Sequence, residues 1–132
     1  MSSISSLNFG KFSLTNFSYL KIWSKTLSIY ENGGIVSAVC HGFTALINIK
    51  LSNGENLISG KKVTGFTNQE EAAVELTSVI PLLLEDELKK SGGIYSGAQN
   101  WESHVISDQR IIIGQNPDSA LGVVQEIIKN MG

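Results

Sequence analysis

Short apolar runs separated by glycine-rich turns dominate the pattern of the chain after residue 32. The β-branched run over residues 35–39 predicts a buried strand, and the segment 43–49 that follows the Cys40-His41-Gly42 corner is compatible with a helix. Residues 63–66 predict a second short strand, which also leads directly into a helix. Two strands that each pass into a helix indicate a mixed α/β domain.

The helix after the second strand begins with a predicted capping box. In this motif the Thr67 side chain accepts from the Glu70 backbone N–H, and the Glu70 carboxylate accepts from the Thr67 N–H. Glu71 is not needed for the cap and is therefore the better carboxylate to consider for chemistry. The alternative for Glu71 is a solvated acid that favours the helix dipole. Pro81 ends this helix and opens another over residues 82–90.

The last part of the pattern predicts a hairpin followed by a helix. Residues 103–107 and 110–113 form two strands joined by a tight turn at residues 108–109. Asn116 and Pro117 cap the final helix, with proline in the first turn. The apolar stripe of that helix is expected to pack against the sheet, and it consists of Leu121, Val124, Ile127 and Ile128.

The first thirty residues differ in composition from the rest, because they are rich in serine and contain no Asp or Glu. We expect residues 1–26 to be a divergent, poorly ordered leader that runs into a short helix over residues 22–30. Residues 27–132 then form one domain. The alternative, an organelle-targeting peptide, is weakened by the absence of arginine.

The bulk composition excludes several classes of partner. A net charge of −2 at pH 7, without a dense Lys/Arg cluster, gives no electrostatic footprint for nucleic acid or an acidic membrane. No apolar run reaches the roughly 18 residues of a membrane span. The single cysteine cannot form an internal disulfide, which favours a reducing, cytoplasmic location and leaves a thiol free for chemistry.

Cys40 is the most informative residue because it lies where a strand turns into a helix. The unpaired N–H groups at such a corner stabilise a thiolate and the oxyanion that forms when it attacks a carbonyl. The alternative is a small buried hydrophobe, the commonest fate of a free cysteine. A metal site built from His41, His104 and an acid lacks a recognisable ligand spacing, so we expect neither metal nor cofactor.

Several strings then occur in the order found in a known family. They are Ala38-Val39-Cys40-His41-Gly42, residues 60–71, residues 81–88, residues 100–105 and residues 114–117. Together they resemble the ThiJ/PfpI superfamily, the class I glutamine amidotransferase-like group that includes glutathione-independent glyoxalases, a deglycase and heat-shock chaperones. The resemblance covers roughly residues 27–132 and implies a flavodoxin-like, three-layer α/β sandwich.

The resemblance also implies a site and a substrate. It assigns Cys40 as the nucleophile, His41 as the adjacent acid/base and Glu71 as the carboxylate that orients the histidine. In the glyoxalase branch the thiolate adds to the aldehyde of methylglyoxal, a small α-oxoaldehyde, and yields lactate without glutathione or a cofactor. Two rival functions stay open: a non-catalytic, chaperone-like stress-response module, and an amidotransferase- or peptidase-like hydrolase at the same cysteine.

Two departures from the family pattern alter these expectations. Members usually have proline after Cys-His-Gly, where this chain has Phe43, so the corner is expected to differ in shape or shielding. Members also carry an N-terminal half with further strands, an acidic residue near the cysteine and part of the oxyanion site, and Cys40 lies too close to Met1 to leave room for them. We therefore expect an N-terminally truncated domain with weak catalysis and a homodimer or partner over an exposed sheet edge.

Overall fold

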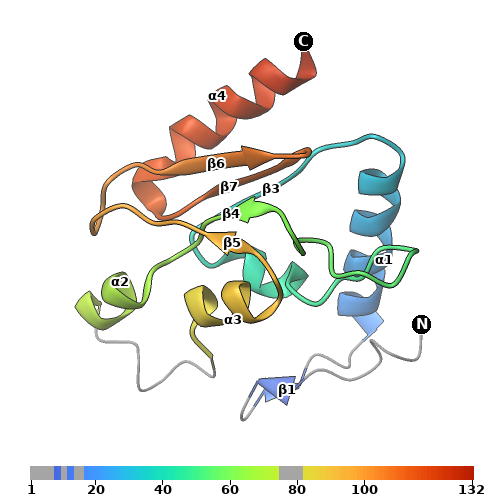
Figure 1. Ribbon diagram of the computed structural model, residues 1–132, viewed down its shortest axis with the longest axis horizontal. Coiled ribbons are helices and arrows are strands. Elements are labelled where there is room, and N and C mark those ends of the chain that lie inside the picture. The colour runs from blue at the N-terminus through green and yellow to red at the C-terminus, as the bar shows by residue number, and fades with distance from the viewer. Residues whose placement is uncertain (1–7, 10–11, 14–16, 75–81) are drawn as a thin grey trace.

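The computed structural model describes residues 8–9, 12–13, 17–74 and 82–132 (Figure 1), and Pro81 lies outside them. The helices are α1 (Phe17–Glu31), η2 (Gly42–Leu46), α2 (Asn68–Ala73), α3 (Leu84–Lys90), η3 (Pro117–Ser119) and α4 (Ala120–Met131). The strands are β1 (Asn8–Phe9), β2 (Phe12–Ser13), β3 (Val36–Val39), β4 (Lys62–Val63), β5 (Ile94–Tyr95), β6 (Val105–Asp108) and β7 (Ile111–Gly114). Among the described helices, none has the length and apolar character needed to cross a membrane.

A three-stranded sheet in the order β3-β7-β6 carries the predicted corner (Figure 1). β3 runs parallel to β7, with Val36 opposite Ile111, and β7 runs antiparallel to β6. A separate parallel pair, β4 and β5, lies beside β6, where the Lys62 backbone N–H donates to the Asp108 carboxylate over 2.7 Å. Within the described residues β3 is therefore an edge strand of the sheet.

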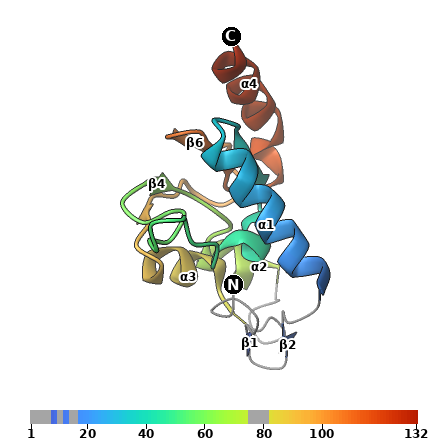
Figure 2. The same cartoon turned by 90° about the vertical axis from the view of Figure 1, so that its right-hand side faces the viewer.

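The two faces of this sheet are covered by different helices. Side chains alternate along a strand, so Val36 and Ile113 share one face, and both belong to the buried apolar cluster that includes Trp23 of α1. Gly114 lies on the opposite face, where an added Cβ would come within 2.7 Å of Val123 of α4. α1 thus packs on the core side and α4 on the other side (Figures 1 and 2).

Helix α1 is longer than the helix expected over residues 22–30. Trp23 is buried, and its indole N–H donates to the Ala45 carbonyl. Near the end of α1 the Tyr30 ring has two cationic groups within reach, those of Lys61 and Arg110. The helix runs across residue 26, and the division of the chain into a leader and a domain stays a prediction.

The helix expected over residues 43–49 is present only in part and is not an α-helix. Only Gly42–Leu46 is helical, as the short 3-10 helix η2. The chain already leaves the helix at Ile49, whose carbonyl accepts the Leu57 backbone N–H over 2.8 Å. Phe43 and Ile49 are both buried in the core, and a segment rich in bulky and β-branched side chains is a poor α-helix former.

β4 and α3 are shorter than predicted. β4 ends at Val63, and two residues later the carbonyl of Gly65 accepts the Tyr95 hydroxyl over 2.9 Å. α3 begins at Leu84, two residues after the expected start. Its first turn faces α2, since the Glu85 carboxylate accepts the backbone N–H of the first α2 residue over 2.9 Å.

The hairpin is confirmed, but its turn lies one residue later than expected. Asp108 still pairs with Ile111, so Gln109 and Arg110 form the two-residue loop. Both loop residues have positive φ, 49° and 68°, which is the backbone that twisted two-residue hairpins require. The Asp108 carboxylate is occupied by the β4 backbone, which favours its place in the strand rather than in the turn.

The orientation of α4 is the largest correction to the predicted fold. Val123 is the buried apolar side chain of this helix, while most of the stripe expected to face the sheet is exposed. The exposed fractions are 69% for Leu121, 50% for Val124 and 64% for Ile128, and Ile127 is partly buried. A Cβ at Gly122 would lie 2.9 Å from Val105 of β6, so α4 approaches the sheet through Gly122 and Val123 rather than through the stripe.

Candidate active site

Cys40 follows β3 at a sharp corner of the backbone. Its φ is 60°, a left-handed conformation that costs a non-glycine residue roughly 1–2 kcal/mol. The Cys40 N–H donates to the Gly114 carbonyl over 2.9 Å, which ties the corner to β7. The cysteine is free and partly exposed rather than enclosed in the core. A strained turn between a strand and a helix is the geometry that presents a nucleophile to a substrate.

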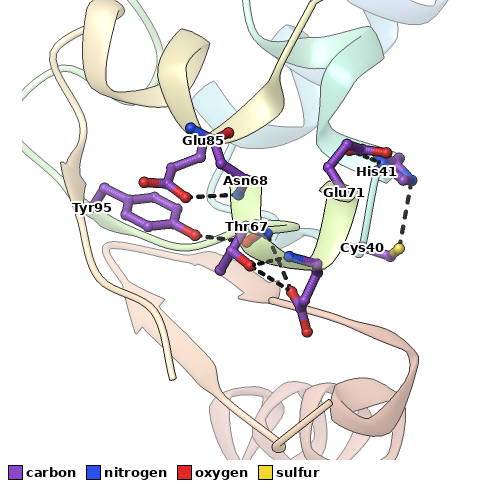
Figure 3. Close-up of polar contacts among 9 residues, drawn as sticks. Cys40, His41, Thr67, Asn68, Glu71, Glu85 and Tyr95 are labelled. Carbon is purple, nitrogen blue, oxygen red and sulfur yellow. Dashed lines mark hydrogen bonds and ion pairs between the residues drawn. The ribbon is translucent and has the colours of Figure 1, made fainter. Parts of the chain in front are cut away.

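His41 bridges the thiol and a buried carboxylate (Figure 3). Its Nδ1 lies 3.6 Å from the Cys40 Sγ, and its Nε2 lies 2.8 Å from Oε2 of Glu71. The imidazole also packs on the ring of Phe66, with 4.4 Å between the two ring centroids. Both nitrogens and one face of the ring are thus in contact, while 42% of the side chain stays open to solvent.

Glu71 lies in the first turn of α2 and is only 1% exposed. The alternative of a solvated surface acid is therefore wrong. Its Oε2 contacts His41, and its Oε1 is buried without a hydrogen-bond partner among the described residues. A buried carboxylate with one side-chain partner interacts most strongly when that partner is positively charged.

The contacts of His41 favour its protonated form. The hydrogen bond with Cys40 raises the pKa of His41 to about 9, with further support from Glu71 and against the opposing effect of partial burial. At neutral pH the ring is therefore an imidazolium with two N–H donors, one toward the sulfur and one toward the carboxylate. This arrangement supplies a positive charge next to the thiol.

Glu70, adjacent to Glu71, forms the predicted capping box with Thr67 and does more than cap the helix. Its carboxylate also accepts the Gln115 side chain over 3.0 Å, the Asn116 side chain over 2.7 Å and the Trp101 backbone N–H over 2.9 Å. Burial alone would raise the pKa of Glu70, but these hydrogen bonds lower it. The carboxylate therefore joins α2 to two distant loops.

Sequence reasoning missed this network, although Asn116 carried a signal. Asn116 does occupy the cap position before Pro117, but its side chain makes no capping bond. Two consecutive amides, Gln115 and Asn116, are fully buried instead, and buried amides need polar partners. The side-chain oxygen of Asn116 accepts the Ser119 hydroxyl over 2.8 Å, which completes its set of hydrogen bonds.

Trp101 extends the ring contacts of His41 beyond Phe66. It is 41% exposed, its φ is 64°, and its ring lies 5.7 Å from that of Phe66, measured between centroids. Because Phe66 itself packs on His41, the three rings form a continuous row. The bond from the Trp101 N–H to Glu70 holds this row in place.

His104 is not brought to the cysteine corner by any contact that the structure describes. Its Nε2 lies 3.0 Å from the Ser96 hydroxyl, and its backbone N–H donates to the Ser119 hydroxyl over 3.0 Å. In the described part of the chain, His, Cys, Asp and Glu side chains form no group of three or more that could hold a metal ion.

No family model matches the chain, but several curated proteins do. It is 36% identical over 107 residues to Glyoxalase 3 of Candida albicans, an alignment that covers 76% of this chain and 45% of the relative. It is 40% identical over 100 residues to the glutathione-independent glyoxalase HSP31 of Saccharomyces cerevisiae, covering 70% and 41%. It is 31% identical over 93 residues to glutamine amidotransferase-like class 1 domain-containing protein 1 of Xenopus laevis, again covering 70% and 41%.

Solved structures agree with these relatives. The Rapid Encystment Protein of 24 kDa from Francisella tularensis superposes with a TM-score of 0.81 at 49% identity, covering 84% of this chain and 49% of that one. Glyoxalase III from Candida albicans gives a TM-score of 0.79 at 32% identity, covering 91% and 54%.

These similarities define a class of protein with a flavodoxin-like α/β fold, as predicted. The chain belongs to the ThiJ/PfpI superfamily, which is the class I glutamine amidotransferase-like group. The glutathione-independent glyoxalases are members of this superfamily. The chain spans about half the length of the curated relatives it matches.

Proposed function

We propose that Cys40, His41 and Glu71 form a cofactor-free site that converts methylglyoxal-like α-oxoaldehydes into 2-hydroxy acids. The observation that carries the proposal is the unbroken series of contacts from the Cys40 Sγ through both nitrogens of His41 to Glu71. The names of the relatives, glutathione-independent glyoxalases, supply the reaction class. The free thiol supports a reducing, cytoplasmic setting.

The side chains of the site and one water molecule account for every bond and proton in the reaction. The Cys40 thiolate bonds to the aldehyde carbon, and the new alkoxide takes a proton from the His41 imidazolium. Neutral His41 then removes the hydrogen from that carbon, and an enediol receives a proton at the neighbouring carbon, leaving a thioester. Water hydrolyses the thioester, which releases the 2-hydroxy acid and restores the thiolate. Glu71 holds the imidazole through its Nε2 and stabilises its charged form.

We expect the activity of this chain to be weak. It spans about half of the relatives, and the residues described here supply a nucleophile and a proton carrier but no second acid beside the sulfur. A missing acid or oxyanion donor each lowers the rate by about a hundredfold or more. We therefore expect slow formation of the 2-hydroxy acid that still requires Cys40.

The test is lactate formation from methylglyoxal without glutathione. Lactate is measured rather than loss of methylglyoxal, because surface Lys and Arg consume the aldehyde without catalysis. The native chain should form lactate, and Cys40→Ala should reduce it to the level of buffer. Far-UV circular dichroism of both proteins checks that the variant is folded. Lactate formation that survives in Cys40→Ala would exclude the thiol mechanism.

The native chain and Cys40→Ala also distinguish two rival functions. The exposed apolar stripe of α4 favours the chaperone-like module, which predicts suppression of aggregation of a client protein by both the native chain and Cys40→Ala. An amidotransferase- or peptidase-like hydrolase, favoured by the similarity to the Xenopus laevis protein, predicts Cys40-dependent ammonia or peptide release and no lactate.

A further inference from the structure

Phe66 contacts the His41 imidazole away from its two hydrogen-bonding nitrogens. Nδ1 of His41 faces the Cys40 Sγ, and Nε2 faces the Glu71 carboxylate. Hydrogen bonds to ring nitrogens are directed along the plane of the ring, so they do little to fix the tilt of that plane. The Phe66 ring lies 4.4 Å from the imidazole between centroids, with 48° between the two planes. This contact restricts the tilt that the hydrogen bonds leave free.

Phe66 is itself held firmly, because the residues on both sides of it are fixed. On one side the Gly65 carbonyl accepts the Tyr95 hydroxyl over 2.9 Å, and an added Cβ at Gly65 would come within 2.9 Å of a side chain of α3. On the other side the Thr67 backbone N–H donates to the Glu70 carboxylate over 3.1 Å. The Phe66 side chain is only 4% exposed. Its ring therefore has little freedom to move away from the imidazole.

Trp101 packs against the other side of this contact. Its ring centroid lies 5.7 Å from that of Phe66, and it is the exposed member of the pair. The Trp101 backbone N–H donates to the Glu70 carboxylate over 2.9 Å. Glu70 thus holds both Trp101 and the residue that follows Phe66. A ring fixed by packing and by hydrogen-bonded neighbours is the kind of support that a reactive group needs in order to keep its geometry.

The aromatic character of Phe66 matters for the charge on His41. Partial burial opposes the protonated form of His41, and an aliphatic side chain in this place would bury the imidazole without compensation. An aromatic ring carries negative charge on its faces and attracts a cation within about 6 Å of its centre. The 4.4 Å separation is well inside that range. The titratable groups that act on His41, Cys40 and Glu71, already occupy its two nitrogens.

We propose that Phe66 is a positioning residue of the site, whose ring fixes the tilt of the His41 imidazole and stabilises its positive charge. Trp101 packs on the outer side of that ring. The effect on the charge of His41 does not require the proposed reaction. The effect on turnover rests on the proposed function, because it acts through proton transfer by His41.

NMR titration of the full chain tests the effect on charge with a matched pair of substitutions. Phe66→Leu keeps an apolar side chain but removes the aromatic ring, so the titration midpoint of His41 should fall from about 9 by about 0.5. Phe43→Leu removes another buried ring, one with no ring contact to His41 among the described residues, and should leave the midpoint unchanged. The signal that is lost in His41→Gln identifies His41, and circular dichroism checks that each variant is folded.

Ring fluorination distinguishes an electrostatic role of Phe66 from a packing role. Fluorine atoms withdraw electron density from the faces of the ring and leave its shape almost unchanged. Replacing Phe66 with a ring-fluorinated phenylalanine should therefore lower the His41 midpoint toward the value in Phe66→Leu, and each added fluorine should lower it further. A midpoint that does not respond to fluorination would overturn the proposal, as would an equal decrease in Phe66→Leu and Phe43→Leu.

Steady-state kinetics of lactate formation test the effect on turnover. Phe66→Leu should lower kcat by about tenfold, because the imidazole is less well oriented for proton transfer. It should leave KM within about twofold, since a ring that is 4% exposed offers almost no surface to a substrate. An unchanged kcat would overturn the positioning role. A native chain that forms no lactate would contradict the proposed function, and the titration would still decide whether Phe66 stabilises the charge of His41.

Discussion

Glu70 and Glu71 are neighbours of the same residue type, equally buried in the first turn of α2, and they differ in almost everything else. The Glu70 carboxylate accepts hydrogen bonds from four other residues, two of them through backbone N–H groups. Among the described residues the Glu71 carboxylate has one hydrogen-bond partner, His41, and its other oxygen has none. Burial is common to both, so the partners decide the role.

The comparison distinguishes a carboxylate that holds the fold from one that serves a reactive group. Fixed neutral donors stabilise the charge of Glu70 in one geometry, and its loss would leave those donors unpaired. The hydrogen-bond partner of Glu71 is a titratable ring whose pKa is raised to about 9, so Glu71 acts through His41. The two residues should therefore respond to substitution in opposite ways.

The largest expected effect is on stability. Glu70→Ala should lower the free energy of unfolding by roughly 3–4 kcal/mol, because several buried donors lose their acceptor. Chemical denaturation measures this change. Glu55→Ala, in an exposed loop, is the control and should stay within about 0.5 kcal/mol. A loss of stability for Glu70→Ala no greater than for the control would contradict the structural role of Glu70.

The next effect is on the proposed chemistry. Glu71→Gln keeps the shape of the side chain but removes the charge that steadies the imidazolium, so lactate formation should fall by about a hundredfold. The same variant should unfold within about 1 kcal/mol of the native chain, since Glu71 has one partner. Steady-state kinetics and denaturation of the same sample give both values. Unchanged kinetics would mean that Glu71 has no positioning role.

A smaller effect separates the cap from the site. Thr67→Ala removes the hydroxyl that accepts from the Glu70 N–H and should destabilise the chain by about 1 kcal/mol. Its lactate formation, measured at a temperature where both proteins are folded, should match that of the native chain. A parallel loss of activity would indicate that the cap and the site are one unit.

The smallest effect is the pH dependence contributed by His41. Its pKa is raised from 6.5 to about 9 in the folded chain, so its stabilising contribution is complete below pH 6.5 and is lost as the pH rises through about 9. Solvent around the half-exposed ring keeps this contribution small. NMR titration of the two histidines should show one with a midpoint near 9, and Glu71→Gln should lower that midpoint. A midpoint near 6.5 for His41 would contradict the charged form.

Local signals in the sequence predict the elements that depend on local chemistry. The capping box at Thr67 and Glu70 and the β-branched strand before Cys40 are both present, because each depends on residues close in the chain. The orientation of α4 was predicted wrongly. An apolar stripe indicates a face that can be buried, but Gly114 and Gly122 select the side that approaches the sheet, and their contacts are with distant residues.

The site was predictable to a similar extent. Cys40 and His41 are adjacent in sequence, and Glu71 was left as the free carboxylate once Glu70 was assigned to the cap. The bonds from Glu70 to Trp101 and Asn116 were not predictable, because they join segments more than thirty positions apart. The positive φ of Trp101 likewise follows from that long-range bond and not from its neighbours.

The left-handed backbone at Cys40 has a consequence for how such a chain evolves. Glycine adopts this conformation without steric cost, whereas cysteine does not. The requirements of folding stability and of reactivity therefore differ at this one residue. A descendant that no longer uses the thiol would gain stability by replacing the whole side chain with the single hydrogen of glycine, so cysteine at this corner carries a steric cost that its reactivity must offset.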